Sequence, residues 1–523
     1  MPSVCALRDK LVLIALVSCV ICLAPAAFAR NTPRFDPIQC PEGFPQLTNA
    51  RCGYLVVPED RSQLSGRTIQ LFVAIIPAQS GKSAPDPIVY LGTGPGGIAI
   101  GEAAILINTG VNLNRDLVVI NQRGQFLSVP ALTCAVIDDF DRQLLSLRFY
   151  SESTKRKHLR ATADCHRKLL ATGADLPSYN TSENAADFAD LRTVLGITEW
   201  NVLGVSYGTD LAQMYVRDHP KGIRSVVLDS VVPVTIGYSL AEYWKTTRVG
   251  FANLFQACAA EAACNAAHPN LETTVTDLVN KLEAAPLTTT VNDPATGEKL
   301  KIVFDGGALV DWIRDQSRSN TQLTRVPALL DQLAHGNPEA LAAIAMYRIQ
   351  LAPPPSPSVP STSAGLGYGV TCSEQFSTDE DIIKAGRWAF PNYPASIQHQ
   401  AVGTFAYLNN DCSRVWKVSA ASAAARRPLV SSIPTLLISG SFDAVTSFDF
   451  AASVAANLSK ATLISIPGIG HYVLPYSPCA QTVFKSFLTD PSTPDTSCVS
   501  TLKPPPFTPF QPEGVAPTVP AIR

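Results

Sequence analysis

Seven short apolar runs, rich in β-branched residues, recur along this 523-residue chain and alternate with helix-like segments. They lie at 69–77, 87–91, 117–121, 200–204, 225–228, 434–438 and 461–466. Runs this short and this apolar are typical of parallel strands that are covered on both faces. Because helix-like segments such as 184–195 and 209–217 lie between them, the pattern is βαβ and predicts an α/β fold with a mostly parallel central sheet.

The alternation of strands and helices stops after Val234 and resumes at Pro434. The chain between these points reads as mostly helical and Ala-rich. We therefore predict one core, formed by 30–235 and 427–502, with a mainly helical cap inserted at 236–426.

Two proline-rich stretches are predicted to lack helices and strands. The Pro/Ser stretch at 352–363 favours extended polyproline conformations, so we expect a linker inside the cap. The tail at 503–523 has a similar composition and is expected to lie along the surface without a fold of its own.

Residues 1–29 have the pattern of a secretory signal. Arg8 and Lys10 precede an apolar run at 11–23, and the small residues of Ala-Phe-Ala at 27–29 suit a signal peptidase. Cleavage after this tripeptide predicts a secreted or periplasmic protein with no stable membrane association. Two alternatives remain open: the run could stay as a membrane anchor, or Cys19 could be the anchored cysteine of a lipoprotein box.

Ten of the thirteen cysteines remain after such a cleavage, which is an even number in an exported chain. Five disulfides are therefore predicted. Their order along the chain suggests pairing between neighbours: Cys40 with Cys52, Cys134 with Cys165, Cys258 with Cys264, Cys372 with Cys412, and Cys479 with Cys498.

Metal and nucleic-acid binding are both disfavoured. No cysteine pair has the spacing of a zinc site with histidines nearby, so we expect no metal and no cofactor. The 41 basic and 43 acidic residues give a formal charge of -2, which provides no long-range field for a polyanion.

The pentapeptide GVSYG at 204–208 fits the G-x-S-x-G nucleophile elbow, a sharp strand-to-helix turn that raises a serine hydroxyl above the sheet. An apolar run precedes it and a helix-like run follows, which is the setting that the motif requires. We therefore predict the α/β-hydrolase fold with Ser206 as nucleophile. The alternative is a glycine turn with a purely structural role.

A serine hydroxyl needs a base, and the base needs a group that orients it. His471 lies in a glycine turn directly after the last apolar run, where this fold places its base. We expect surface positions for the other six histidines: His158, His166, His219, His268, His335 and His399.

The acid that orients the base comes between serine and histidine in the chain order of this fold, and Asp443 directly follows the strand-like run at 434–438. Asp229, after an earlier run, is its rival.

Acyl transfer also needs donors for the oxyanion that forms on the attacked carbonyl. The loop GTGPGG at 92–97 follows a strand-like run, and the backbone N–H of Gly94 is our candidate for one donor. The backbone N–H of Tyr207, directly after the nucleophile, is the other. A phosphate-binding glycine loop is disfavoured because no Gly-Lys-Ser/Thr follows.

Together these motifs resemble the prolyl and tripeptidyl aminopeptidase family of α/β-hydrolases, which are serine exopeptidases with a helical cap. The matching stretches span most of the chain: GTGPGG at 92–97, NQRG at 121–124 with Ser128, Pro130, Leu132 and Cys134, the segment from Asp187 through Leu195-Gly196 to GVSYGT, VLDS at 227–230, GSFDAVT at 440–446 and GIGH at 468–471. The segment from Cys479 to Cys498 resembles the C-terminal region of the tripeptidyl branch.

This chain departs from the family pattern at two positions. Gly92 stands where the family usually has the histidine of His-Gly-Gly-Pro-Gly, and Asn121 stands where it usually has the aspartate of Asp-Gln-Arg-Gly. Neither change removes a backbone donor or a predicted triad residue, so we expect catalysis to survive.

The resemblance implies a peptide substrate, hydrolysed through an acyl-enzyme. An exopeptidase needs a carboxylate for the substrate's free ammonium, and the family keeps it in the cap, where Glu374 is our candidate; the alternative is a solvated loop carboxylate. The same triad would also serve a carboxylesterase acting on a small ester. A binding protein that has kept the fold without catalysis is the third hypothesis.

Overall fold

The computed structural model describes residues 32–510, apart from 64, 238, 321, 354–359, 361 and 375–376. The expected signal, most of the Pro/Ser stretch and the tail beyond Phe510 lie outside the described residues. Within the described part, no helix has both the length and the apolar character needed to cross a bilayer.

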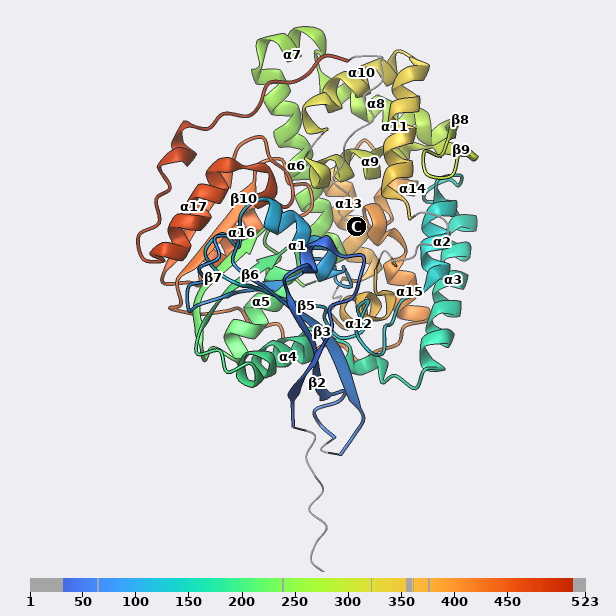
Figure 1. The fold of residues 1–523 in the computed structure, drawn as a ribbon. Coiled ribbons are helices and arrows are strands. Elements are labelled where there is room, and N and C mark those ends of the chain that lie inside the picture. The colour runs from blue at the N-terminus through green and yellow to red at the C-terminus, as the bar shows by residue number, and fades with distance from the viewer. Residues whose placement is uncertain are drawn as a thin grey trace, which may run out of the picture.

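A sheet of nine strands forms the centre of the molecule (Figure 1), in the order β1-β2-β3-β5-β4-β6-β7-β10-β11. Its strands are β1 (Arg34–Ile38), β2 (Arg51–Pro58), β3 (Thr68–Ile76), β5 (Leu117–Ile120), β4 (Ile88–Leu91), β6 (Trp200–Val205), β7 (Ile223–Asp229), β10 (Thr435–Gly440) and β11 (Ala461–Ile466). The strands from β5 to β11 are parallel, whereas β1, β2 and β3 are antiparallel additions at one edge. The predicted α/β-hydrolase fold is confirmed, and each of the seven apolar runs forms a strand.

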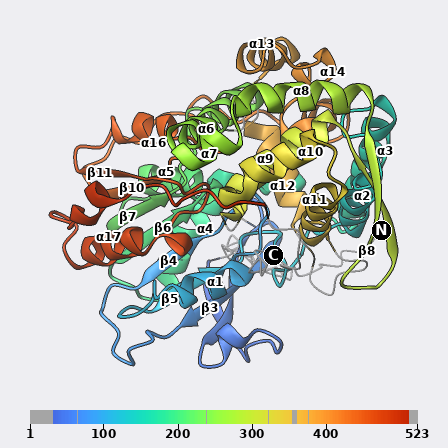
Figure 2. The same cartoon turned by 90° about the horizontal axis from the view of Figure 1, so that it is seen from above.

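Helices cover both faces of the sheet (Figure 2). One face packs on α1 (Ala99–Asn108) and α17 (Pro478–Thr489), the other on α4 (Thr181–Val194), α5 (Tyr207–Asp218) and α16 (Phe448–Ala455). In β4, the side chains of Ile88 and Tyr90 pack on the face that α1 and α17 cover. Those of Val89 and Leu91 pack on the opposite face. All four side chains are buried because successive residues of a strand point to opposite faces.

The chain between β7 and β10 contributes α6 to α15 and a hairpin. Its elements are α6 (Leu240–Ala260), α7 (Ala262–Ala267), α8 (Leu271–Ala284), β8 (Leu287–Asn292), β9 (Lys299–Phe304), α9 (Gly306–Ser319), α10 (Val326–Ala334), α11 (Pro338–Leu351), α12 (Ala364–Glu374), α13 (Asp379–Ala389), α14 (Ala395–Gln398) and α15 (Leu408–Arg414). They occupy the upper and right-hand part of Figure 1, together with α2 (Ala135–Leu144) and α3 (Glu152–Leu170). The β8–β9 hairpin forms a sheet of its own that was not predicted.

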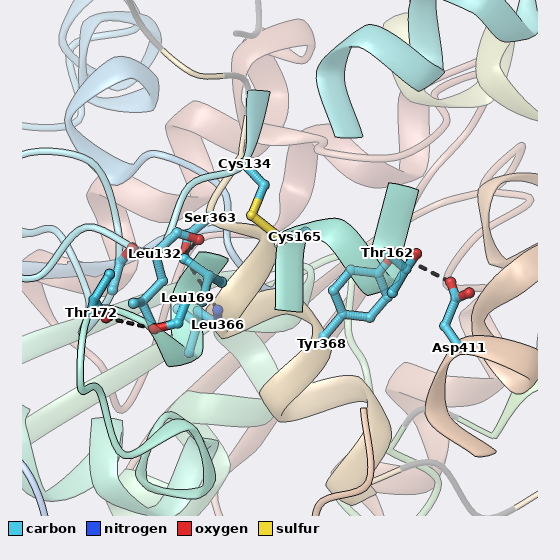
Figure 3. Close-up of a disulfide and its surroundings, with 11 residues drawn as sticks. Leu132, Cys134, Thr162, Cys165, Leu169, Thr172, Ser363, Leu366, Tyr368 and Asp411 are labelled. Carbon is cyan, nitrogen blue, oxygen red and sulfur yellow. Dashed lines mark hydrogen bonds between the residues drawn. A yellow bond between two sulfur atoms is a disulfide. The ribbon is translucent and has the colours of Figure 1, made fainter. Parts of the chain in front are cut away.

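All five disulfides join the neighbouring cysteines that the sequence order suggested. The bond between Cys134 and Cys165 lies beside the start of α12, where Ser363 and Leu366 pack against the core (Figure 3). The Ser363 hydroxyl donates to the backbone oxygen of Gly124 at 2.7 Å. These contacts fix α12, the helix that ends in Glu374, against the sheet domain.

His158 corrects one of the sequence predictions. Its ring is buried between α3 and α15, where it stacks on Tyr407 with ring centroids 4.5 Å apart. Its Nδ1 lies 3.0 Å from a carboxylate oxygen of Asp411. The expectation of a surface position was wrong because the carboxylate that satisfies the ring lies 253 residues away in the sequence.

Candidate active site

Ser206 lies at the sharp turn from β6 to α5, with φ of 54° and ψ of -122°. A left-handed φ is rare for a residue other than glycine and marks local strain. The turn is tight on both sides: a Cβ at Gly204 would lie 2.4 Å from the Gly208 oxygen, and a Cβ at Gly208 would lie 2.0 Å from the Leu91 oxygen. Only glycines fit here, and the close approach to Leu91 brings the loop after β4 beside the serine.

Three side chains from separate strand ends meet in a hydrogen-bonded row. His471 Nε2 lies 2.9 Å from Ser206 Oγ, and His471 Nδ1 lies 2.8 Å from Asp443 Oδ2. Asp443 also accepts hydrogen bonds from the backbone N–H groups of Val445 and Thr446, at 2.7 and 2.8 Å. The row therefore has the geometry in which a base can take the serine proton while a carboxylate orients the ring.

The carboxyl of Asp443 is fully buried but strongly stabilised as the anion. Burial raises its pKa, but the His471 ring and the hydrogen bonds from Thr446 outweigh that effect, so the pKa lies below its ordinary value. The hydroxyl of Thr446 donates to Asp443 Oδ2 at 2.6 Å and lies 3.0 Å from His471 Nδ1. Thr446 was missed from the sequence, although it lies only three residues after the acid.

Asp229, the rival acid, has a different position. Its Oδ1 accepts the N–H of Val473 and its Oδ2 accepts the N–H of Leu474, both at 2.9 Å. Burial raises its pKa to about 6. Asp229 thus holds the backbone that follows His471, while Asp443 contacts the imidazole.

The C-terminal end of α9 holds the histidine loop from the other side. The N–H of His471 donates to the Ser317 oxygen at 2.5 Å, and the Asn320 side chain donates to the His471 oxygen at 2.6 Å. Asn320 also accepts the N–H of Gly470 at 2.5 Å. Neither Ser317 nor Asn320 was identified from the sequence, because nothing in a helical segment signals that its end contacts a loop about 150 residues further on.

Glu102 of α1 holds the loop at 92–97, which contains Gly94, through hydrogen bonds. The buried carboxylate accepts the Thr93 N–H at 3.0 Å and the Tyr90 hydroxyl at 2.6 Å. A Cβ at Gly92 would lie 3.1 Å from Glu102 Oε2, so this carboxylate occupies the space that a side chain at position 92 would need. Gly94 itself has φ of 129°, which favours glycine.

Two further carboxyl groups lie close to the row. Asp210 is one helical turn after Ser206 and fully buried, and neither of its oxygens has a hydrogen-bond partner among the described residues. Glu374, at the end of α12, is 4% exposed, and its Oε2 is likewise without a partner in the described part of the chain. The predicted solvated alternative for Glu374 therefore does not hold, because the side chain is buried.

Burial raises the pKa of both groups. For Glu374 the pKa rises to about 7, against an opposing effect of hydrogen bonds from Thr181. For Asp210 burial raises the pKa well above its ordinary value, and the nearby negative charge of Glu374 acts in the same direction. Asp210 was missed from the sequence, since an aspartate within a helix carries no recognisable signal. Two buried carboxyl groups of this kind are suited to bind a positively charged group of a ligand.

Parts of the chain are similar to known hydrolases and proteases. Residues 103–337 match the family described as "alpha/beta hydrolase fold", and residues 399–499 match the family described as "TAP-like protein". The chain is 30% identical over 192 residues to tripeptidyl aminopeptidase of Streptomyces lividans, which covers 35% of each chain. It is 27% identical over 277 residues to serine protease Hip1 of Mycobacterium tuberculosis, covering 49% of this chain and 51% of that protein.

The matched regions thus span between about a third and a half of the length of these curated relatives. Among solved structures, proline iminopeptidase of Mycobacterium smegmatis matches with a TM-score of 0.36 and 14% sequence identity, over 84% of this chain and 98% of that one.

Proposed function

We propose that this chain, which has the α/β-hydrolase fold, is a serine hydrolase and, more narrowly, a peptidase that releases N-terminal residues or short peptides, of the tripeptidyl or prolyl type. The observation that carries the hydrolase part of the proposal is the row in which His471 lies 2.9 Å from Ser206 and 2.8 Å from Asp443. Its similarity to a tripeptidyl aminopeptidase and a serine protease supports a peptide substrate.

In the proposed reaction Ser206 Oγ attacks the scissile carbonyl carbon while His471 Nε2 accepts the hydroxyl proton. The backbone N–H groups of Gly94 and Tyr207 stabilise the oxyanion. Breaking the C–N bond releases the amine, which takes the proton from the imidazolium, and leaves an acyl-enzyme on Ser206. Water then attacks the acyl group by the same proton transfer and regenerates the serine.

The preference for a free N-terminus is assigned to Glu374 together with Asp210. An exopeptidase must hold the substrate ammonium at a fixed distance from the nucleophile, and Asp210 is one helical turn from Ser206. An ammonium group has three donors, and three carboxyl oxygens of this pair are without partners among the described residues. Because burial raises the pKa of both carboxyl groups, binding of the ammonium would favour their ionised forms.

Secretion or a periplasmic location is proposed from the signal pattern at 1–29 and from the five disulfides, because such bonds persist in oxidising compartments. Anchoring through Cys19 is the minor alternative. The helical segment at 236–426 is proposed as the cap that limits access to the serine.

A carboxylesterase is the second candidate, because the row alone does not distinguish an ester from an amide. The test is a panel of aminoacyl and tripeptidyl amides beside short acyl esters, run on the wild type and on Ser206→Ala. We expect the wild type to cleave the amides with free N-termini and the variant to be inactive. Cleavage of esters alone would refute the peptidase assignment, and no labelling of Ser206 by a fluorophosphonate probe would point to a non-catalytic binding protein.

A further inference from the structure

Arg314, on α9, is a buried cation without a direct counter-ion. Its side chain is 1% exposed, and neither Nε nor Nη2 has a hydrogen-bond partner among the described residues. No carboxylate of the described chain forms an ion pair with it. A guanidinium in this position loses its hydration, and that loss needs compensation by a partner.

Neither acidic neighbour of Arg314 on its own helix provides that partner, because Asp311 Oδ1 is itself without a hydrogen-bond partner among the described residues and Asp315 pairs with Arg318. Burial raises the pKa of Asp311 to about 7, so this group is only partly ionised near neutral pH. Burial and the nearby Arg318 lower the pKa of Arg314, while Asp315 and Asp311 act in the opposite direction. The guanidinium keeps its charge at neutral pH all the same, because arginine side chains are not deprotonated in proteins.

The position of Arg314 relates it to the catalytic row. It lies one helical turn before Ser317, and residues three apart share a helix face. Ser317 accepts the N–H of His471 and, through its hydroxyl, the N–H of Ala444 at 3.3 Å. The face of α9 that carries Arg314 is therefore the face that contacts the histidine loop.

Two aromatic rings connect Arg314 with the neighbourhood of the nucleophile. The Arg314 Cζ lies 5.1 Å from the centroid of the Phe405 ring, which stacks on Tyr243 at 4.5 Å. Burial raises the pKa of Tyr243, Arg314 lowers it, and Asp210 raises it, so both charged groups lie within electrostatic reach of this ring. Arg314 and Tyr243 thus both contact the Phe405 ring, and Arg314 lies on the side of α9 that contacts the histidine loop.

We propose that Arg314 binds a carboxylate group of the substrate, so that the preferred substrates are short peptides that carry both a free ammonium and a carboxylate. A planar guanidinium with free donors matches the two oxygens of a carboxylate better than any other common side chain does. The inference rests on the proposed function, in which Asp210 and Glu374 hold the ammonium. The carboxylate has two possible sources, an acidic side chain or the free C-terminus of a short peptide.

The test measures binding by calorimetry in the Ser206→Ala protein, so that no peptide is consumed. Three tetrapeptides share Ala-Ala-Ala and end in Gln-amide, in Glu-amide or in Gln with a free C-terminus. We expect at least one carboxylate peptide to bind about 30-fold or more tightly than the Gln-amide peptide. The form that gains affinity identifies the source of the carboxylate.

The same titrations on the double variants with Arg314→Met and Arg314→Lys test the assignment of the residue. The methionine variant should bind all three peptides with similar affinity, and the lysine variant, which keeps the charge, should retain part of the preference. Arg348→Met is the matched control, because Arg348 is another buried arginine of this region but donates to the Val303 oxygen at 3.0 Å. This control should keep the full preference.

Equal affinities for the three peptides in the Ser206→Ala protein, or a preference that survives Arg314→Met, would overturn the inference. A purely structural role of Arg314 would lower the melting temperature of the methionine variant and leave the preference intact. Failure of the proposed peptidase function has a separate signature, because it appears in the wild type as fluorophosphonate labelling without cleavage of any peptide.

Discussion

The proposed catalytic row (Ser206, His471, Asp443 and Thr446) differs from three buried groups without partners (Asp210, Glu374 and Arg314, which we call the unpartnered cluster) in how its polar atoms are satisfied. In the row, Asp443 accepts hydrogen bonds from His471, from Thr446 and from the backbone. In the cluster, five buried polar atoms are without hydrogen-bond partners among the described residues: Asp210 Oδ1 and Oδ2, Glu374 Oε2, and Arg314 Nε and Nη2.

This difference separates chemistry from recognition. A row that is fully hydrogen-bonded before the substrate arrives needs no rearrangement when charge develops on the imidazole. A buried group left without a partner destabilises the free protein, and only a ligand that supplies the partner offsets that cost. We infer that the row is organised for proton transfer and that the cluster is completed by the substrate.

The largest expected effect comes from breaking the row. His471→Ala removes the base, and kcat should fall by about 10⁵ to 10⁶-fold. Asp443→Asn keeps the shape of the side chain but removes its charge, and kcat should fall by about 10⁴-fold. Steady-state kinetics on one tripeptidyl amide, with thermal unfolding of each variant, provides the measurement. If the histidine variant kept more than about a hundredth of the activity, the row would not be the catalytic centre.

The next effect concerns the oxyanion loop. A Cβ at Gly94 would lie 2.5 Å from the Gly96 nitrogen, so Gly94→Ala must displace the loop, and kcat should fall by about 10² to 10³-fold with little change in KM. Gly196→Ala is the matched control, because Gly196 also has a left-handed φ, of 67°, but an added Cβ would meet nothing within 4 Å. Normal kcat in the Gly94 variant would exclude this N–H as a donor.

The sequence predicted three of the four residues of the row, because Ser206, Asp443 and His471 each follow an apolar strand. A parallel sheet brings the carboxyl ends of its strands to one edge, so Ser206, Asp443 and His471 could be placed near one another from the positions of three runs. Thr446 was quoted only as the last residue of the stretch GSFDAVT and was given no role, whereas Glu102 belongs to no motif. The antiparallel strands β1 and β2 were missed as well, since β1 contains Asp36 and Pro37 and the apolar run of β2 is short and ends at Pro58.

The cluster could be predicted only in part. Glu374 was found by its resemblance to a family position in the cap, whereas Asp210 and Arg314 lie within regular helices and have no sequence signal of their own. Their importance follows from burial without a partner, which depends on how α5, α9 and α12 pack together. That packing joins residues more than a hundred positions apart, and no local pattern encodes it.

A smaller effect is expected from Asp210→Asn, which keeps the side-chain volume but removes a charge from the cluster. For peptides with a free N-terminus, kcat/KM should fall by about 10 to 10²-fold, mainly through KM, because the amide cannot neutralise an ammonium. For the matching N-acetylated peptides, which lack that ammonium, the change should be much smaller. Equal losses on both series would assign Asp210 a structural role, since only recognition of the ammonium distinguishes them.

The smallest effect is a gain in stability from Glu374→Gln at alkaline pH. Burial raises the pKa of Glu374 to about 7, so the folded protein holds this proton at a pH where the unfolded chain has lost it. The free energy of unfolding therefore decreases as the pH rises from about 4.5 to 7, and the full cost of the buried charge applies above that range. A glutamine has no such cost, so the free energy of unfolding of the variant should exceed that of the wild type by on the order of 2 kcal/mol at pH 8 and should equal it near pH 4.

Denaturant unfolding at the two pH values measures the difference, with the exposed Glu199→Gln as control. A variant less stable than the wild type at pH 8 would show that Glu374 is already paired in the free protein, and the contrast between row and cluster would then be lost.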